Sequence, residues 1–398
     1  MRQLFKGLYI LYEVVTTLLI RAPLWYILAI PRRLRPKPSW TIGRTFHLRF
    51  LQYICAGSSF GPWLYSLMHI PNYLALEQGL DVKGVWIPAV PQHVHGHLAQ
   101  WAKGANVKPV CIPGYWLEKK GTDLPVDASP LQDEKVLLVL HGGGYTAQSA
   151  HPHDLCANIP RGILEYAGPN LVRAFMVEYR LSKPATETPS NPFPAALLDA
   201  LAGYCYLVYI VGFAPKDIII EGDSAGGNLA LALTRYLIET AATSPGSPGA
   251  LVLCSPWLDL GPYPIHLSSS VHANKATDYI DITGAGHRAA ISSFIGPHGM
   301  AETVTNPYIS PASQARAMPS ISFKGFPRTF ILSGGGEAFR DEIRVLRDKM
   351  EDRDTGSDAE VKYVEFPDAW HDFLLFSDVE PERSTALAMI VEWIDQMA

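Results

Sequence analysis

One serine, Ser224, lies in the stretch GDSAGG, after the apolar run III at 218–220 and before a segment rich in Ala and Leu. The spacing G-x-S-x-G, with Gly222 and Gly226, is typical of a sharp turn between a strand and a helix that leaves the serine oxygen exposed. Bulky residues at the two glycine positions would block this turn. A serine presented in this way can attack a carbonyl carbon and form an acyl-serine intermediate. The pattern therefore predicts that Ser224 is a nucleophile.

Three consecutive glycines, at 142–144, follow His141 and the apolar run VLLVL at 136–140. A tight turn needs one or two glycines, so a third leaves additional backbone N–H groups uncovered. Attack of a serine on a carbonyl creates a negatively charged oxygen, which N–H donors must stabilise. The glycine loop supplies such donors, and the N–H of Ala225, beside the serine, is another. We expect His141 to brace the loop through hydrogen bonds.

The motifs HGGG and GDSAGG together resemble those of the hormone-sensitive-lipase branch of the α/β-hydrolases, the α/β-hydrolase fold-3 esterases and deacetylases. EYRLSKPATETPSNPFPAALLDAL at 178–201 and SPWLDL at 255–260 are similar to further segments of that family. The resemblance spans about residues 80–395 and is to membrane-associated members of fungal type. It implies an α/β-hydrolase fold with an eight-stranded, mostly parallel sheet, helices on both faces and a helical cap. It also implies Gly143 and Gly144, with Ala225, as oxyanion donors, and no cofactor.

In this fold the acid and the histidine follow the serine along the chain. The segment SGGGEAFRDE offers Glu337, Asp341 and Glu342 after an apolar strand. The family has an aspartate where Glu337 stands, so we predict Glu337 as the acid; a longer carboxylate can still orient an imidazole. His371, in EFPDAWHDF, matches the family's histidine.

Other polar residues are predicted to have lesser roles. Gly142, Asp223 and Asp341 are candidate supporting residues around the catalytic group. The pair His151 and His153 has no carboxylate-rich partner motif, so no metal site is predicted. Three more histidines are expected to be surface or lid residues of the cap: His272, His287 and His298.

Strands and helices must alternate to bring these residues together. Short apolar runs predict eight strands, at 84–90, 107–121, 136–140, 171–182, 217–227, 250–257, 328–335 and 362–366. Helix-like segments between them, such as 194–210 and 225–240, indicate a mainly parallel sheet covered on both faces, and the first two strands are predicted to be antiparallel.

Two stretches do not fit this alternation, and we expect both to form a cap over the strand ends. They are residues 39–80 and about 258–325, the second an insertion in a catalytic domain at 81–398. Five apolar residues of the insertion are expected to line the space above Ser224: Pro264, Ile265, Phe294, Ile295 and Pro297.

The first 38 residues are predicted to bind a membrane. Residues 4–30 are apolar apart from a stripe of charges that includes Lys6, Glu13 and Arg21. This pattern is typical of a helix lying in the membrane interface or spanning it with one polar face. The basic cluster RRLRPK at 32–37 would meet lipid headgroups. We expect the endoplasmic reticulum membrane, with a cytosolic catalytic body.

The charge and the cysteine content of the chain limit the partners and the covalent cross-links that we expect. A net charge of −5 and a pI near 6.2 argue against a nucleic-acid partner. The five scattered cysteines are expected to be free thiols, and the oligomeric state is left open.

The expected function is hydrolysis of an apolar ester by a serine carboxylesterase or deacetylase. Candidate substrates are a steryl acetate, a terpenoid or other secondary-metabolite ester, or a short acylglycerol. Alternatives are an amidase or formamidase, an acyltransferase with the same residues, and a non-catalytic ligand-binding receptor.

Overall fold

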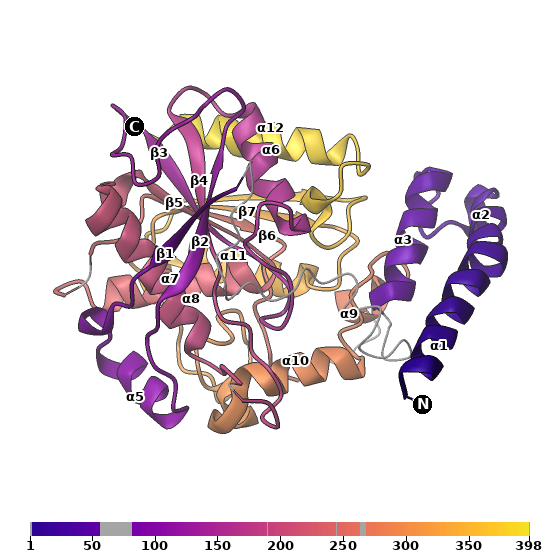
Figure 1. Ribbon diagram of the computed structural model, residues 1–398, viewed down its shortest axis with the longest axis horizontal. Coiled ribbons are helices and arrows are strands. Elements are labelled where there is room, and N and C mark those ends of the chain that lie inside the picture. The colour runs from indigo at the N-terminus through magenta and orange to yellow at the C-terminus, as the bar shows by residue number, and fades with distance from the viewer. Residues whose placement is uncertain (1, 56–81, 189, 244, 263–267, 398) are drawn as a thin grey trace.

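A single eight-stranded sheet forms the centre of the computed structural model, which describes residues 2–55, 82–188, 190–243, 245–262 and 268–397 (Figure 1). The strand order is β1-β2-β4-β3-β5-β6-β7-β8. The strands are β1 (Lys83–Ile87), β2 (Ile112–Glu118), β3 (Lys135–Leu140), β4 (Leu171–Val177), β5 (Ile218–Asp223), β6 (Ala250–Cys254), β7 (Arg328–Gly334) and β8 (Val361–Phe366). Each lies within or beside an apolar run that predicted it.

Strand directions confirm the mostly parallel sheet. The ladder β4-β3-β5-β6-β7-β8 is parallel throughout, whereas β2 is antiparallel to both β1 and β4. The antiparallel start was therefore predicted correctly. Because parallel strands end at one edge of a sheet, the loops after β3, β5, β7 and β8 lie close together. These four loops carry the residues that the sequence singled out.

Helices cover both faces of the sheet, as predicted. The α-helices of the described residues are α1 (Arg2–Thr16), α2 (Ala22–Ala29), α3 (Ile42–Cys55), α5 (Gly96–Gly104), α6 (Asn158–Tyr166), α7 (Ala195–Cys205), α8 (Ala225–Glu239), α9 (Ser270–Ala273), α10 (Ala285–Ile295), α11 (Arg340–Glu351) and α12 (Glu382–Asp395). Helices α6 and α12 pack on one face, and α7, α8 and α11 on the other (Figure 1). In β3, Leu138 joins one core and Leu137 the other. Burial of both faces explains why this strand is a continuous apolar run.

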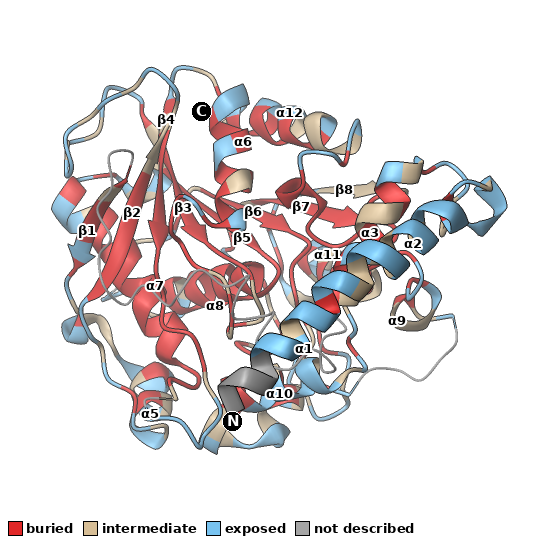
Figure 2. Ribbon diagram, turned by 45° about the vertical axis from the view of Figure 1, so that its right-hand side comes forward, coloured by how far each residue is buried: buried red, intermediate tan, exposed pale blue. Residues whose placement is uncertain are grey.

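The amino-terminal helices lie beside the sheet, with α3 between the body and the outer pair α1 and α2 (Figure 1). The surface of α1 and α2 is mostly exposed (Figure 2). Gly7–Ala29 is long and apolar enough to cross a membrane. Only 6% of the residues in its 18-residue apolar stretch are buried within the protein. Helix α3 instead buries Leu48 and Leu51 against the body.

The insertion between β6 and β7 contributes α9 and α10. Its residues Pro264 and Ile265 lie outside the described residues, as do residues 56–80 of the expected amino-terminal cap segment. The described part of that segment, α3, packs beside the loop after β8. The division into 1–38, 39–80 and 81–398 stays a prediction.

Candidate active site

Ser224 lies in a sharp turn between β5 and α8. Its backbone has φ 49° and ψ −116°, a conformation that few non-glycine residues adopt. A Cβ atom on Gly226 would lie 1.8 Å from the carbonyl oxygen of Leu140, and one on Gly222 would lie 2.4 Å from the carbonyl oxygen of Gly226. Only glycine fits at these two positions. The two glycines of the sequence pattern thus permit the turn that holds Ser224.

The loops after β7 and β8 bring an acid and a histidine to this serine. Nε2 of His371 lies 3.1 Å from Oγ of Ser224, and Nδ1 of His371 lies 3.3 Å from Oε2 of Glu337. All three side chains are buried. A histidine in this position can take the serine proton while the carboxylate orients the ring and stabilises its charged form.

Three local contacts distinguish Glu337 from Asp341, the neighbouring candidate acid. The other carboxylate oxygen of Glu337 accepts the N–H of Gly334, at 3.2 Å, which directs the side chain back toward β7. Asp341 instead pairs with Arg340, at 3.0 Å, and accepts the N–H of Ser270, at 2.7 Å. The geometry therefore connects Glu337, and not Asp341, with His371.

The glycine loop follows β3 and lies against the serine turn. Gly143 and Gly144 have φ values of 93° and 60°, which favour glycine. A Cβ atom on Gly143 would lie 2.2 Å from the carbonyl oxygen of Ala147. Among the described residues, no acceptor engages the N–H groups of Gly143, Gly144 or Ala225. The oxyanion role predicted for these donors stays a prediction.

The residues around the glycine loop hold it in place. The N–H of Gly142 donates to Oδ1 of Asp223, at 2.9 Å, which ties the loop to the residue before the serine. His141 stacks on Tyr179 with ring centroids 4.1 Å apart, and the Tyr179 hydroxyl donates to the His141 carbonyl oxygen at 2.7 Å. Burial lowers the pKa of His141 to about 4, partly offset by its hydrogen bond to the Gly142 carbonyl. His141 is therefore neutral near pH 7 and acts as a brace.

The sequence of this chain matches a known protein family. A family model described as the alpha/beta hydrolase fold matches residues 137–375, more than half of the chain. The chain belongs to this alpha/beta hydrolase family. The matched region contains the glycine loop, the serine turn and both loops that carry Glu337 and His371.

Individual known proteins are also similar to this alpha/beta hydrolase, in sequence or in structure. An esterase of Acinetobacter venetianus is 28% identical over 72% of this chain and 81% of its own length. An acetyl-hydrolase of Streptomyces hygroscopicus is 28% identical over 64% of this chain and 74% of its own. The solved structure of an esterase from the bacterial hormone-sensitive lipase family has a TM-score of 0.58 and 23% identity over 88% of this chain and 97% of that one. At this identity the structural likeness supports the shared fold alone.

A second carboxylate touches His371, and sequence reasoning missed it. Oδ2 of Asp372 lies 3.0 Å from Nε2 of His371, on the nitrogen that also faces Ser224. Asp372 has φ 48°, and its N–H donates to Oγ of Ser255 at 3.1 Å. The only signal in the sequence is an acid directly after the histidine.

The acids around His371 control its charge. Burial alone lowers the pKa of His371, but Asp372 and Glu337 raise it by more, so that it lies well above the ordinary value of 6.5. Asp223 and Glu221 lie buried on the same strand, and burial with the nearby charge of Asp372 raises the pKa of each, to about 8 for Glu221. The carboxylates beside His371 therefore stabilise its protonated form, and burial makes Glu221 and Asp223 harder to ionise.

An aromatic wall adjoins His371 in this alpha/beta hydrolase. The ring of Phe339 meets His371 edge-on at 5.0 Å, and Tyr279 lies 5.9 Å from it. Trp257 stacks on Phe339 at 6.2 Å and contacts His287 of α10 at 4.9 Å. Burial lowers the pKa of His287 to about 4. His287, expected as a surface or lid residue of the cap, lies half-buried on α10 beside this wall.

Helix α10 covers the glycine loop. A Cβ atom on Gly144 would lie 3.9 Å from Cβ of Ala290, and Phe294 stacks on Tyr145. The Tyr145 hydroxyl donates to Oδ1 of Asn228 on α8, at 2.7 Å. Phe294 is thus buried against the residue that follows the three glycines.

The other histidines that the sequence singled out contact residues other than Ser224, His371 and Glu337. His151 and His153 contact each other, with ring centroids 5.1 Å apart, and His298 lies 3.0 Å from the Phe193 carbonyl oxygen. His272, in α9, is only partly buried. Within the described ranges, no group of three or more histidine, cysteine or acidic side chains could hold a metal ion.

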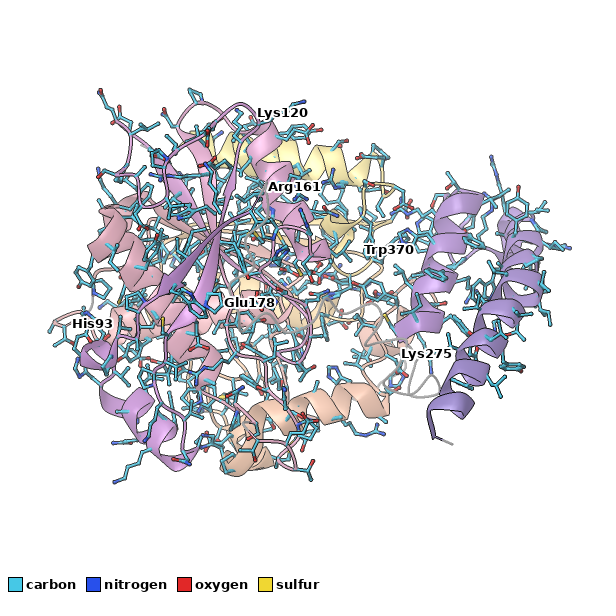
Figure 3. The ribbon with its side chains drawn as sticks, viewed as in Figure 1. His93, Lys120, Arg161, Glu178, Lys275 and Trp370 are labelled. Carbon is cyan, nitrogen blue, oxygen red and sulfur yellow. The ribbon has the colours of Figure 1, made fainter. Side chains whose placement is uncertain are left out.

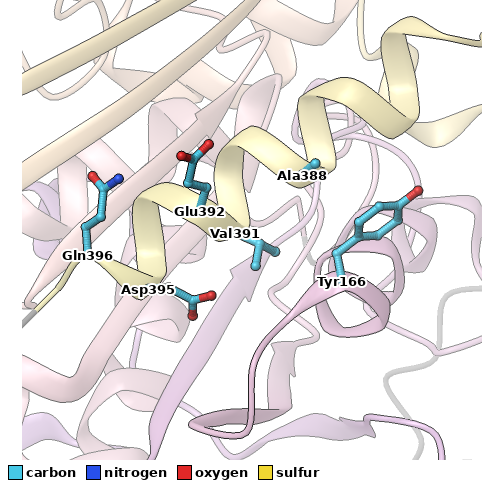
Figure 4. A pocket seen from close by; sticks show the side chains of 6 residues that line it. All are labelled: Tyr166, Ala388, Val391, Glu392, Asp395 and Gln396. Atoms are coloured by element: carbon cyan, nitrogen blue, oxygen red, sulfur yellow. The ribbon is translucent and has the colours of Figure 1, made fainter.

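A surface pocket between α6 and α12 differs from the Ser224 site in the side chains that line it (Figure 4). Its volume is about 450 Å³, and its lining residues are Tyr166, Ala388, Val391, Glu392, Asp395 and Gln396. It contains neither a serine nor a histidine, so it offers no nucleophile with a base.

Proposed function

We propose that this protein is a serine carboxylesterase that works through an acyl-serine intermediate. The observation that carries the proposal is the continuous series Ser224–His371–Glu337, with successive contacts of 3.1 and 3.3 Å. A ligand-binding receptor would have no need of this series. The relatives named esterase and acetyl-hydrolase support the same reaction class.

Each residue then has a definite task. Ser224 Oγ attacks the ester carbonyl carbon while Nε2 of His371 accepts the hydroxyl proton, and the N–H groups of Gly143, Gly144 and Ala225 stabilise the oxyanion. The bond to the alcohol oxygen breaks, and His371 returns the proton to that oxygen. His371 then deprotonates a water, which attacks the acyl carbon and releases the acid and Ser224. Glu337 orients the imidazole throughout.

We propose an apolar ester as the substrate. The wall of Phe339, Tyr279 and Trp257 beside His371 would favour apolar groups, at about 0.8 kcal/mol per buried CH₂. A steryl acetate, a terpenoid or other secondary-metabolite ester, or a short acylglycerol has this character.

We propose further that α1 and α2 bind a lipid bilayer. Glu13 and Arg21 pair at 2.8 Å, and the Tyr53 hydroxyl of α3 donates to Glu13 at 2.5 Å, so these charges face α3. The outward surface is apolar, with exposed side chains that include Leu8, Leu11, Leu18, Leu19, Ile20, Leu24, Ile27 and Leu28. Such a surface favours lipid over water. The endoplasmic reticulum as the membrane, and the cytosol as the side of the body, stay predictions.

Purified full-length protein tests the reaction. It should hydrolyse p-nitrophenyl esters of short acyl chains and react covalently with a fluorophosphonate, and Ser224→Ala should lose both properties while it stays folded. Labelling that persists in Ser224→Ala would remove this serine as the nucleophile. Faster turnover of a matched anilide than of the ester would favour an amidase.

Sedimentation with phospholipid vesicles tests the membrane contact. A variant with Leu11, Leu19 and Ile27 changed to Glu should stay in the supernatant yet hydrolyse a soluble ester at the parental rate, because these side chains are exposed. A control with three exposed apolar side chains of the body changed to Glu (Val126, Leu131 and Tyr166) should sediment with the parent. Equal sedimentation of all three proteins would contradict the proposal.

A further inference from the structure

Asp278 is a buried carboxylate in the insertion, between α9 and α10, and the reaction described above does not use it. Its oxygens accept three backbone N–H groups. Oδ2 accepts from Ala338 at 2.7 Å, and Oδ1 accepts from His371 at 3.2 Å and from Tyr279 at 2.8 Å. Burial raises the pKa of Asp278 to about 6, so it is mainly ionised near pH 7. An ionised carboxylate makes stronger hydrogen bonds to N–H donors than a neutral group does.

Two of these donors belong to the loops that carry the catalytic pair. Ala338 directly follows Glu337 in the loop after β7, and His371 lies in the loop after β8. The loops also meet through the N–H of Gly336, which donates to the Ala369 carbonyl oxygen at 2.8 Å. Asp278 adds a bridge immediately beside the two catalytic side chains.

Side chains next to Asp278 also bind the loop after β7, which carries Glu337 and is called the acid loop. The Asn274 amide donates to the carbonyl oxygens of Glu337 and Gly335, at 2.7 and 3.1 Å. The Thr277 hydroxyl donates to the Gly336 carbonyl oxygen at 2.8 Å. This part of the insertion therefore binds the backbone of the acid loop along its length.

Helix α3 supports the same arrangement from outside. The Gln52 amide donates to the Asp278 carbonyl oxygen at 2.8 Å. Trp40, which precedes α3, packs against Trp370, the neighbour of His371, with ring centroids 5.3 Å apart. Trp370 and Lys275 both lie on the side of the body that faces α3 (Figure 3). Asp278 is thus held by its own insertion on one side and by α3 on the other.

We propose that Asp278 is a positioning residue for the catalytic triad. Its carboxylate sets the relative position of the loops that carry Glu337 and His371, and so aligns Nε2 of His371 with Ser224. This inference rests on the proposed esterase function. A small displacement of a catalytic group can lower turnover by about 10²-fold.

The test compares Asp278→Asn with Asp281→Asn in the full-length protein. The amide that replaces the Asp278 carboxylate would have one acceptor oxygen in place of two, so one loop would lose its bond. Asp281 lies nearby in the same insertion, but its side chain bonds only within its own turn, to Thr283, among the described residues. We expect Asp278→Asn to lower kcat for p-nitrophenyl acetate by about 10²-fold, with KM within about twofold of the parent. Asp281→Asn should match the parent in both constants.

The end point of fluorophosphonate labelling separates positioning from folding. Asp278→Asn should label to the same final stoichiometry as the parent but more slowly. An unchanged kcat would overturn the proposal, and so would a fall in final stoichiometry that accounts for the loss of kcat, because Asp278 would then serve folding. A parent protein that neither hydrolyses the ester nor labels would instead overturn the proposed function, and with it this inference.

Discussion

Phe294 lies flat against Tyr145, with ring centroids 3.9 Å apart and an interplanar angle of 10°. Tyr145 directly follows the three glycines, so the stack connects the cap helix α10 to the loop that would hold the oxyanion. Because α10 comes from the insertion between β6 and β7, this insertion both covers the glycine loop and packs against the residue that follows it.

Phe294→Ala should lower kcat on acetyl esters, because Tyr145 loses the ring that holds it. The loss of a buried ring should also cost about 3–5 kcal/mol of stability. Phe326→Ala is a matched control, since Phe326 is also buried and packs against Phe323 at 5.0 Å. Both variants should unfold at lower temperature, but only Phe294→Ala should lose turnover per folded molecule. Equal turnover in the two would show that the stack serves stability alone.

Glu337→Gln should reduce turnover by up to about 10⁴-fold, because a neutral amide cannot stabilise the charged imidazole as a carboxylate does. Asp341→Asn is the control. This carboxylate is partly exposed and contacts Arg340 and Ser270, so its loss should leave kcat nearly unchanged. Steady-state kinetics of the two variants check the assignment, and the reverse ranking would transfer the role of the acid to Asp341.

Asp372→Asn should shift the pH dependence of kcat/KM to lower pH. The base must be neutral to accept the serine proton, so activity rises with pH through the pKa of His371. Asp372 and Glu337 raise that pKa against the opposing effect of burial, so removal of one carboxylate lowers it. Asparagine tolerates the positive φ of this position. Profiles from pH 5 to 10 should show the shift, whereas Asp378→Asn, at a partly exposed surface acid, should not. A shift to higher pH would refute the electrostatic role of Asp372.

Glu221→Gln should raise stability at alkaline pH. Burial and the charge of Asp372 raise the pKa of Glu221 from 4.5 to about 8, and neither carboxylate oxygen has a partner among the described residues. The native state therefore holds this proton more tightly than the unfolded chain, so stability falls as pH rises from about 4.5 to 8. Melting temperatures should agree with the parent at pH 4.5 and exceed it at pH 9. The exposed Glu165→Gln should change neither value, and a lower melting temperature for Glu221→Gln at pH 9 would contradict the expectation.

The parts of the site that the sequence predicted are those with a local signal. Ser224 and the glycine loop each follow an apolar strand and carry small residues that only a tight turn requires. His371 and Glu337 follow later strands whose ends the parallel sheet brings to the same edge. The contacts of Asp278 and Asp372 could not be predicted, since they depend on side-chain directions and on loops far apart in the chain. The docking of α3 beside Trp370 was missed for the same reason.

The backbone of Ser224 has a further consequence for the evolution of the chain. A non-glycine residue held at positive φ costs about 1–3 kcal/mol, and the surrounding fold must supply this free energy. Glycine at position 224 would relieve the strain, so the inactive variant Ser224→Gly should be more stable than its parent, and Ser224→Ala should not. Selection for thermal stability alone would then remove Ser224, the proposed nucleophile. A screen that enriches stable variants of this protein must therefore retain a requirement for activity.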